Sequence, residues 1–396
     1  MRDPSLHSDD KWLAGDEIVA VKILIAPDKF KGSLNAREVA ENIAKGLRDG
    51  TRDVEIEIVP MADGGEGTAE AICDARGGSW LQCKAHDPFG REIDARYGCI
   101  ESGKIAVMEM SEAAGMRRIS EDQRDPVRAT TFGVGEMILD ATKRAANEII
   151  IGLGGSATND GGFGMARALG FRFDYDHEHE HEHEHEHEKM CVTDLLKLKG
   201  IGNPKDLKLP KIIAAVDVKN PLLGKSGATR VFGPQKGASQ NELKILERAL
   251  SRLADVVAKE FGFDHRDEPG AGAAGGLGFG LMSFCGAKVR PGFDVVAEAV
   301  GLESKIKDAD IVITGEGSLD RQTLEGKTPA GVARLARKLG KPVFAIVGRA
   351  TKDREVREMF DGVYENARPG MSEQENMSHA AELLRENARE LGKTLS

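Results

Sequence analysis

Residues 148–164 read EIIIGLGGSATNDGGFG, an apolar stretch followed directly by a glycine-rich polar loop. The pattern predicts a β-strand, a loop and a helix that begins near Met165. Glycines let the backbone approach a ligand closely, and the free N–H groups at a helix start attract anions. The stretch therefore indicates a phosphate site in a protein of alternating strands and helices.

The loop matches neither of two common phosphate motifs. It is not a Walker A sequence because no Gly-Lys-Ser or Gly-Lys-Thr closes it, and its glycine spacing does not fit the dinucleotide fingerprint. A tight turn that binds no ligand is the alternative. The loop residues that we expect to contact phosphate are Gly154, Gly155, Ser156, Thr158, Asn159 and Asp160.

Strands and helices alternate at both ends of the chain. Val21–Ala26 predicts a strand, and the helix after it begins with the capping box Asn35-x-x-Glu38. Ile311–Thr314 predicts another buried strand, and Thr328 and Pro329 open a further helix. Alternation of this kind is typical of an α/β fold with a parallel sheet.

This pattern predicts two domains. Residues 21–85 and 290–396 form a discontinuous Rossmann-like domain, and residues 86–289 form an inserted α/β domain. Residues 1–20 are polar and predict a flexible N-terminal extension rather than a signal peptide.

Composition excludes several classes of protein. The net charge of −10 includes six Glu from the His-Glu alternation at 177–188, which we expect to lie in a low-complexity loop spanning 176–189. The histidines of that tract could chelate a metal ion, but charged low-complexity tracts are more often solvated loops than metal sites. Nucleic-acid binding is not expected without a basic stripe, and no apolar run is long enough to cross a membrane. Without a membrane span or a signal peptide, we expect a cytoplasmic protein. The five cysteines form no CxxC pair, so we expect them to be free thiols.

Polar residues follow several predicted strands, where ligands of open α/β sheets bind. Lys31 and Ser33 lie after the first strand, and Asp63, Gly64 and Gly65 lie after the second. A carboxylate in the second loop could also serve only as a helix cap.

Acidic residues follow two further strands. Glu316 and Asp320 follow Ile311–Thr314, a pattern suited to Mg²⁺. Asp217 ends the apolar run Ile212–Val216, where burial would raise its pKa. Two other segments, 232–237 and 269–278, are rich in glycine, which suits either a close ligand approach or close helix packing.

Six ordered motifs give the chain a family resemblance. They read APDKFKGSL (26–34), ADGGEGT (62–68), GGSATNDGG (154–162), FGPQKGA (232–238), PGAGAAGG (269–276) and ITGEG (313–317). The chain resembles the type I glycerate kinases from about Val21 to its C-terminus. The resemblance implies ATP-dependent phosphorylation of D-glycerate to 2-phosphoglycerate, with the active site in a cleft between two domains. The chain departs from the family pattern at the His-Glu tract and the N-terminal extension.

Roles for the candidate residues follow from loop position and residue type. Asp217 is the expected base, Asp63 orients glycerate, and Lys31, Ser33, Gly64 and Gly65 form the substrate pocket. The Gly154–Gly162 loop holds the phosphates of ATP, and Glu316 and Asp320 bind Mg²⁺ directly or through water.

Several alternatives stay open at this point. The product could be 3-phosphoglycerate, or the substrate another small hydroxy acid. An NAD-dependent oxidoreductase is disfavoured because no dinucleotide fingerprint follows the first strand. A metal-storage or sensing protein built on the His-Glu tract would bind metal without ATP turnover. A homodimer is left open.

Overall fold

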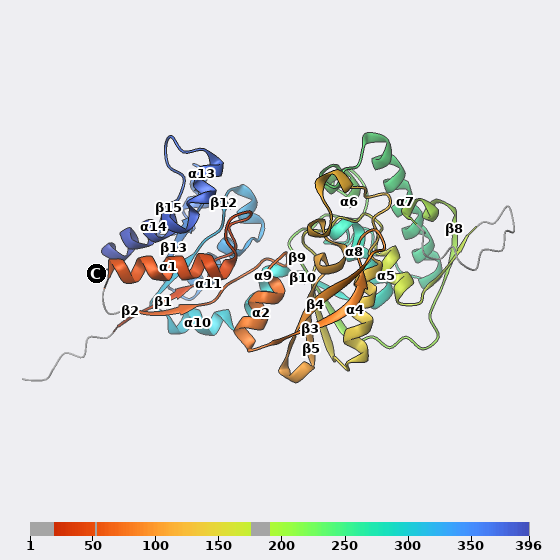
Figure 1. The fold of residues 1–396 in the computed structure, drawn as a ribbon, viewed down its shortest axis with the longest axis horizontal. Helices are drawn as coiled ribbons and strands as arrows, with labels where there is room; N and C mark the ends of the chain where they lie inside the picture. Colours follow the sequence, from red (N-terminus) through yellow and green to blue (C-terminus); the bar gives the residue numbers. More distant parts are fainter. Residues whose placement is uncertain (1–19, 52–53, 176–190, 396) are drawn as a thin grey trace, which may run out of the picture.

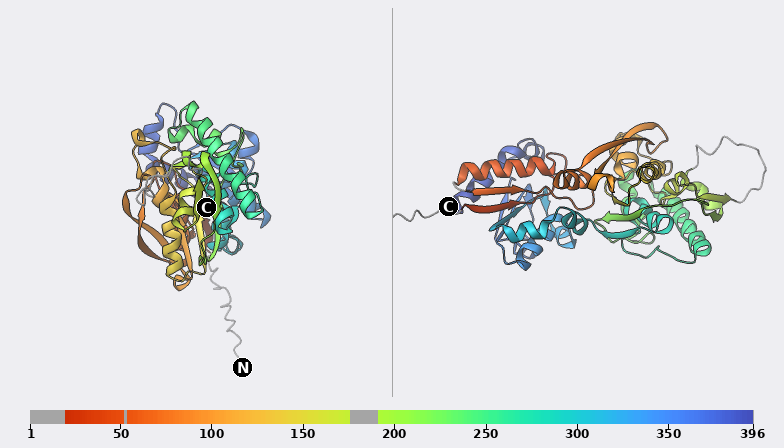
Figure 2. Two further views of the ribbon diagram at one scale, coloured as in Figure 1. Left: turned by 90° about the vertical axis from the view of Figure 1, so that its right-hand side faces the viewer. Right: turned by 90° about the horizontal axis from the view of Figure 1, so that it is seen from below.

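The computed structural model describes residues 20–51, 54–175 and 191–395, which form two lobes along its long axis (Figures 1 and 2). Both described chain ends lie in the same lobe (Figure 1). The His-Glu tract and nearly all of the predicted N-terminal extension lie outside the described residues. No helix in the described part of the chain is long and apolar enough to cross a membrane.

The first lobe contains a five-stranded sheet drawn from both ends of the chain. Its order is β15-β13-β11-β1-β2, and all its neighbouring strands are parallel. In β1, Ile23 pairs with Ile311 of β11 on one side and with Ile56 of β2 on the other. The strands are β1 (Val21–Ile25), β2 (Val54–Ile58), β11 (Ile311–Thr314), β13 (Val343–Val347) and β15 (Gly362–Glu365).

Helices cover both faces of this sheet. On one face, α1 (Ala36–Gly50) and α14 (Ala380–Thr394) pack against Ile23, Ile25 and Ile313. The predicted capping box begins α1, since Asn35 accepts a bond from the backbone N–H of Glu38 at 2.8 Å and Glu38 accepts one in return at 2.9 Å. On the other face lie α10 (Leu302–Asp308) and α11 (Thr328–Lys338).

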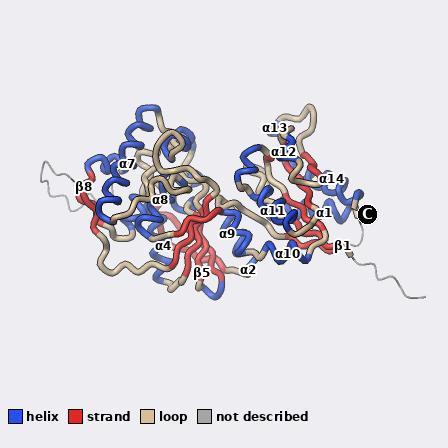
Figure 3. The backbone as a smooth tube through the Cα atoms, turned by 180° about the vertical axis from the view of Figure 1, so that it is seen from behind, coloured by secondary structure: helices blue, strands red, loops and turns tan. Residues whose placement is uncertain are grey.

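The second lobe contains a six-stranded sheet of order β10-β9-β6-β5-β4-β3 (Figure 3). Strands β5, β6, β9 and β10 are parallel, while β4 runs antiparallel to both β3 and β5. Residues 79–85, which were expected in the first domain, therefore belong to the second sheet, because they pair with β4 as a hairpin. The strands are β3 (Ser79–His86), β4 (Glu92–Ile100), β5 (Ile105–Glu109), β6 (Glu148–Gly152), β9 (Lys211–Val216) and β10 (Lys288–Pro291).

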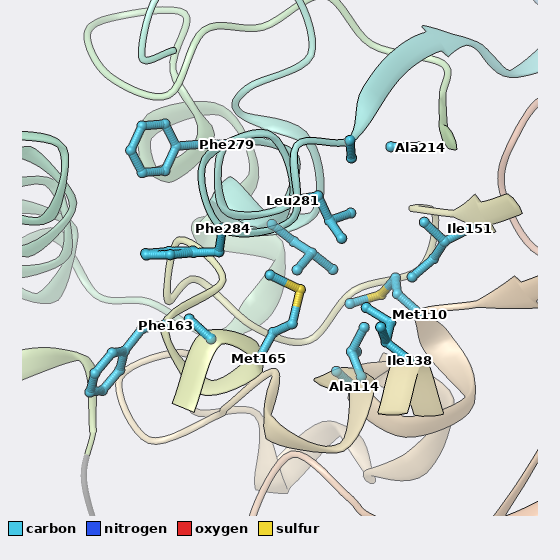
Figure 4. Packing of buried hydrophobic residues seen from close by; sticks show 14 of the residues in the cluster. Met110, Ala114, Ile138, Ile151, Phe163, Met165, Ala214, Phe279, Leu281 and Phe284 are labelled. Atoms are coloured by element: carbon cyan, nitrogen blue, oxygen red, sulfur yellow. The ribbon is translucent and has the colours of Figure 1, made fainter. Parts of the chain in front are cut away.

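A large apolar core supports this second sheet. Met110, Ile151, Met165 and Leu281 are fully buried in it, and their side chains converge between strand and helix (Figure 4). The helices that contribute most are α4 (Phe132–Lys143), α5 (Phe163–Ala168), α7 (Gln240–Phe261) and α8 (Ala273–Cys285).

The two lobes share a continuous apolar cluster. It joins Val107 and Ile150 of the second sheet to Leu24 and Val312 of the first. Helices α2 (Thr68–Arg76) and α9 (Gly292–Ala299) lie between them (Figure 1). Burial of this cluster fixes the position of the strand ends of one sheet relative to those of the other.

The remaining elements are short. They are β7 (Arg172–Tyr175), β8 (Leu198–Gly202), β12 (Ser318–Leu319), β14 (Arg349–Ala350), α3 (Ser111–Ala114), α6 (Ala228–Phe232), α12 (Arg354–Arg357) and α13 (Glu373–Ser378), and the 3₁₀ helices η1 (Glu101–Gly103), η2 (Met116–Arg118), η3 (Glu121–Gln123), η5 (Val192–Lys197), η6 (Pro234–Lys236) and η7 (Arg321–Glu325).

Candidate active site

The loop after β2 brings the carboxyl ends of the two sheets together. A side chain on Gly64 would come within 2.8 Å of the carbonyl oxygen of Ala215 in β9, and one on Gly152 would come within 2.7 Å of the carbonyl oxygen of Gly64. Gly154 likewise packs against the backbone of Gly65. Glycine is required here because the loops meet backbone to backbone.

Asp28 is a buried carboxylate at this junction, directly after β1. Thr328 donates a hydrogen bond from Oγ1 to its Oδ2 at 2.7 Å, and the backbone N–H of Lys29 donates to Oδ1 at 2.7 Å. Burial, followed by repulsion from Asp63, raises the pKa of Asp28 to about 6.

Asp217 directly follows β9, as the sequence predicted, and its pKa is also raised to about 6. Desolvation is the larger cause and the charge of Asp63 the second. The residue as a whole is exposed, and Asp63, Lys29 and Lys327 all lie close enough to act electrostatically on its carboxyl group. Asp63 thus acts electrostatically on both Asp28 and Asp217.

Asp63 does not cap the helix that follows it. Its Oδ1 accepts a hydrogen bond from the backbone N–H of Gly65 at 3.2 Å, within its own loop. The start of α2 is capped instead by Glu109 at the end of β5, which accepts bonds from Gly67 and Ala69 at 2.9 and 3.1 Å. The simple capping alternative for Asp63 is therefore excluded.

Glu316 and Asp320 lie together after β11. Burial, with smaller contributions from the charges of Asp28 and Asp320, raises the pKa of Glu316 to about 7. Thr323 opposes this shift by donating a hydrogen bond from Oγ1 to Oε1 of Glu316 at 2.7 Å. This pair is thus electrostatically connected to the carboxylates of the junction.

The junction opens into a cavity of about 360 Å³, a size typical of small-molecule sites, which span about 300–1,000 Å³. Lys29, Lys31 and Ser33 line it from the first lobe, and Trp80 and Arg96 line it from the second. The guanidinium of Arg96 lies 4.5 Å from the ring centre of Trp80. Both predicted substrate residues of this wall therefore face the cavity, although the Ser33 hydroxyl also donates to the Met377 carbonyl at 2.8 Å.

The predicted phosphate loop divides into an exposed edge and a buried part. Gly155 is exposed and has a φ of +73°, which favours glycine, whereas Ser156 is buried. Lys236 donates hydrogen bonds to Ser156 Oγ and to the Thr158 carbonyl, both at 2.6 Å.

The last three predicted phosphate ligands face the interior of the second lobe. Thr158 and Asn159 have no exposed surface and Asp160 has 1 %. Asn159 donates to Thr229 Oγ1 at 3.0 Å. Asp160 accepts bonds from Gly162, Gly164 and both the backbone and hydroxyl of Thr131, at 2.9 to 3.1 Å. In this structure the side chains of Asn159 and Asp160 hold the loop in place, and contact with phosphate remains a prediction for all three residues.

The glycine-rich segment 269–278 packs against protein backbone. A side chain on Gly275 would collide with the Thr158 carbonyl, one on Gly276 would come within 2.9 Å of Gly161 Cα, and one on Gly278 would collide with the Gly270 carbonyl. Close packing, which the sequence left as the alternative to ligand contact, therefore accounts for these glycines.

The carboxylates of the junction suit a magnesium ion that is bound mainly by water and nucleotide phosphates. No three His, Cys, Asp or Glu side chains of the described ranges converge as a metal cage. Mg²⁺ bound with nucleotide needs only one or two protein carboxylates, however. Burial is the main cause of the raised pKa values of Asp28, Asp217 and Glu316, and repulsion between neighbouring carboxylates adds to it. A bound cation would relieve that repulsion.

Comparison of the sequence with known proteins identifies the family of the chain. The model of the glycerate kinase family matches residues 23–396. The chain belongs to the glycerate kinase family. It is 40 % identical over 377 residues to glycerate kinase from Bacillus subtilis (strain 168), covering 95 % of this chain and 98 % of the relative. It is 44 % identical over 333 residues to glycerate 2-kinase from Escherichia coli (strain K12), covering 84 % of this chain and 86 % of the relative.

A solved structure supports the same assignment. A crystal structure from Salmonella typhimurium LT2, described provisionally as glycerate kinase 2, has a TM-score of 0.81 and 41 % identity. The alignment covers 95 % of this chain and 98 % of that one. The two-sheet α/β fold expected from the resemblance to glycerate kinases is confirmed.

Three further residues of the candidate site, Asp28, Lys29 and Lys327, were not among the predicted site residues. Asp28 and Lys29 lie inside a motif that was singled out for Lys31 and Ser33. Lys29 donates from Nζ to the Glu66 carbonyl, and Lys327 lowers the pKa of Asp217 and Glu316. The signal available for Asp28 was its position immediately after the apolar strand, which predicts burial of a charge.

Proposed function

We propose that the protein transfers the γ-phosphoryl group of ATP to D-glycerate and releases 2-phosphoglycerate and ADP. The observation that carries the proposal is the meeting of Asp28, Asp63 and Asp217 beside Lys29 where the strands of both sheets end. The 2-position is supported by the name of the Escherichia coli relative, glycerate 2-kinase.

Asp217 is proposed to accept the proton of the attacking hydroxyl. A pKa of about 6 leaves its carboxylate ionised at neutral pH, yet with a higher proton affinity than an ordinary Asp. Asp63, held by the N–H of Gly65, is proposed to orient glycerate. Gly64 and Gly65 would offer backbone groups, and Lys31 and Ser33 would bind the carboxylate from the cavity wall.

The nucleotide is proposed to lie with its phosphates against the edge of the loop formed by the half-buried Gly154 and the exposed Gly155. Glu316 and Asp320, with Asp28 nearby, would hold Mg²⁺. Bound there, the cation would neutralise charge on the transferring phosphoryl group. Because ATP is the phosphoryl donor and all five cysteines are free thiols, we place the reaction in the cytoplasm.

A coupled assay tests the proposal. Purified protein, ATP, MgCl₂ and D-glycerate are incubated, and product is detected with enolase and pyruvate kinase, with or without phosphoglycerate mutase. Signal without mutase is expected for 2-phosphoglycerate. Signal only with mutase would assign the other hydroxyl, and ATP turnover only with a different hydroxy acid would assign another substrate.

A further inference from the structure

Lys236 is a buried lysine that the proposed reaction has not used. It ends η6 in the FGPQKGA motif, and 2 % of its surface is exposed. Its ammonium donates two hydrogen bonds, to Ser156 Oγ and to the Thr158 carbonyl, each at 2.6 Å. Both acceptors are neutral and both belong to the glycine-rich loop, about 80 residues earlier in the chain.

The charge of this ammonium is poorly compensated by the protein. Within the described ranges, no carboxylate lies close enough to Lys236 to form an ion pair. Asp160 is the acidic group that acts on it, but the oxygens of Asp160 already accept bonds from Thr131, Gly162 and Gly164. Burial consequently lowers the pKa of Lys236 to about 7. A buried cation in such surroundings gains strongly from an incoming anion.

The ammonium lies directly behind the exposed edge of the loop. Its acceptor Ser156 is the neighbour of Gly155, and Gly154 packs against Gly65 beside the carboxylates. Two buried hydroxyls of the same region have no hydrogen-bond partner in the described structure, Thr158 Oγ1 and Ser111 Oγ. A side chain on Gly155 would lie 3.5 Å from Ser111 Cβ, so Ser111 adjoins the exposed edge. The loop thus has a buried charge behind it, and the unsatisfied Ser111 hydroxyl adjoins the edge where an anion would enter.

We propose that Lys236 binds the terminal phosphates of the nucleotide at the Gly154–Ser156 edge, supplying from a distant segment the cation that this loop lacks in its own sequence. In a Walker A loop the lysine follows the glycines directly and reaches the β- and γ-phosphates. Here the third N–H of the ammonium is available for a phosphate oxygen while the other two hold Ser156 and Thr158. The inference rests on the proposed function, because it assigns the anion to ATP.

The test compares nucleotide binding by calorimetry in the full-length protein. Lys236→Met and Lys236→Gln remove the charge, and the probes are adenosine and ADP with MgCl₂. Loss of a charged hydrogen bond, worth about 1.5–3 kcal/mol, should weaken ADP binding about 10- to 100-fold. Adenosine binding should stay unchanged, because it has no phosphate.

Thr229→Val is the matched control for disturbance of the loop. Thr229 is also fully buried and holds the loop through Asn159, but it carries no charge. Its ADP affinity should stay within about threefold of wild type. Equal losses for ADP and adenosine in the lysine variants, or an equal loss of ADP affinity in Thr229→Val, would overturn the proposal in favour of a structural role.

The dependence of ADP affinity on pH gives a second test, because a purely structural role of Lys236 in loop packing would not produce it. The wild-type ammonium loses its proton as pH rises through about 7, so ADP affinity should fall between pH 7.5 and 9 by up to about tenfold per unit. Lys236→Met keeps the other charged groups beside η6, which are Asp160, Arg124 and Arg230. The ADP affinity of this variant should therefore not change with pH over the same range. The same fall of ADP affinity with pH in wild type and in Lys236→Met would contradict the proposal. Failure of wild type to phosphorylate glycerate would refute the proposed function alone, since ADP binding is measured separately.

Discussion

Asp28 and Thr328 are 300 positions apart in the chain, yet the Thr328 hydroxyl donates a 2.7 Å hydrogen bond to the Asp28 carboxylate. The bond joins the loop after β1 to the first turn of α11. It lowers the pKa of Asp28, in opposition to burial and to Asp63. The second half of the chain thereby helps to keep a carboxylate of the candidate site ionised.

Thr328→Val should remove this bond and raise the pKa of Asp28 further. We expect the acid limb of the pH profile of kcat/KM to shift to higher pH, and stability to fall by about 1–3 kcal/mol because a buried acceptor loses its donor. Urea unfolding and the pH profile check both effects. Thr142→Val, which removes a hydroxyl bonded to the Ile138 carbonyl, should leave the profile in place.

Asp217→Asn should lower kcat by about 10²- to 10⁴-fold with little change in either KM, because the variant keeps the shape of the side chain and removes the base. Asp63→Asn should act mainly by raising KM for glycerate. Steady-state kinetics with both substrates checks the pair. Exchanged phenotypes would exchange the two roles, and near wild-type turnover of Asp217→Asn would make it a structural carboxylate.

Glu316→Gln should be stabilising at high pH in metal-free buffer. The pKa of Glu316 is raised to about 7 from its usual 4.5, so the folded protein binds more protons than the unfolded chain between these values. The cost of burying the charge is therefore absent below about pH 4.5 and fully present above pH 7. Relative to wild type, the variant should gain up to about 3 kcal/mol at pH 8 and much less at pH 5.

Glu375 provides a control with the opposite sign. It belongs to the exposed capping box of α13, where hydrogen bonds from Ser372 lower its pKa. Its stabilising effect is present above its usual pKa and is lost as pH falls. Glu375→Gln should therefore be the less stable protein at pH 8, as thermal unfolding in EDTA can show. A gain for both variants at pH 8 would contradict the assigned cause.

Gly155→Val should raise KM for ATP by much more than KM for glycerate. The φ of +73° disfavours valine, and the added side chain would occupy the exposed edge of the loop. Initial rates with each substrate varied in turn check this. A change confined to glycerate would place the two substrates in the opposite parts of the cleft.

Replacing residues 177–188 by a short Gly-Ser linker should leave kcat/KM within about threefold. The tract lies outside the described residues. The strands before and after it, β7 and β8, pair with each other, and the last residue pair of this ladder is Tyr175 with Leu198. The cost of closing a loop varies slowly with its length. Assays in metal-free buffer check the result, and a larger loss would connect the tract to the active site.

Features set by local sequence were predicted well. The capping box at Asn35, the strands at both chain ends and the raised pKa of Asp217 after β9 follow from periodicity and neighbouring residues. The role of Asp160 and the position of Lys236 depend on contacts between segments tens of residues apart. Such contacts leave no periodic signal, and a polar residue in a glycine-rich loop has the same sequence pattern whether it binds a ligand or the protein interior.

The sheet of the first lobe also constrains the order in which the chain can fold. Strand β1 lies between β2 and β11, so only the β1–β2 pair can form early, and β11, β13 and β15 arrive after the whole second sheet has been synthesised. The second lobe, by contrast, is continuous in sequence from β3 to β10. During translation the second lobe should therefore fold first and become resistant to proteases. The first lobe can fold only after its C-terminal strands have been synthesised. Released chains that end at Pro291 should already resist proteolysis over residues 79–175 and 191–291, whereas β1 and α1 should remain cleavable.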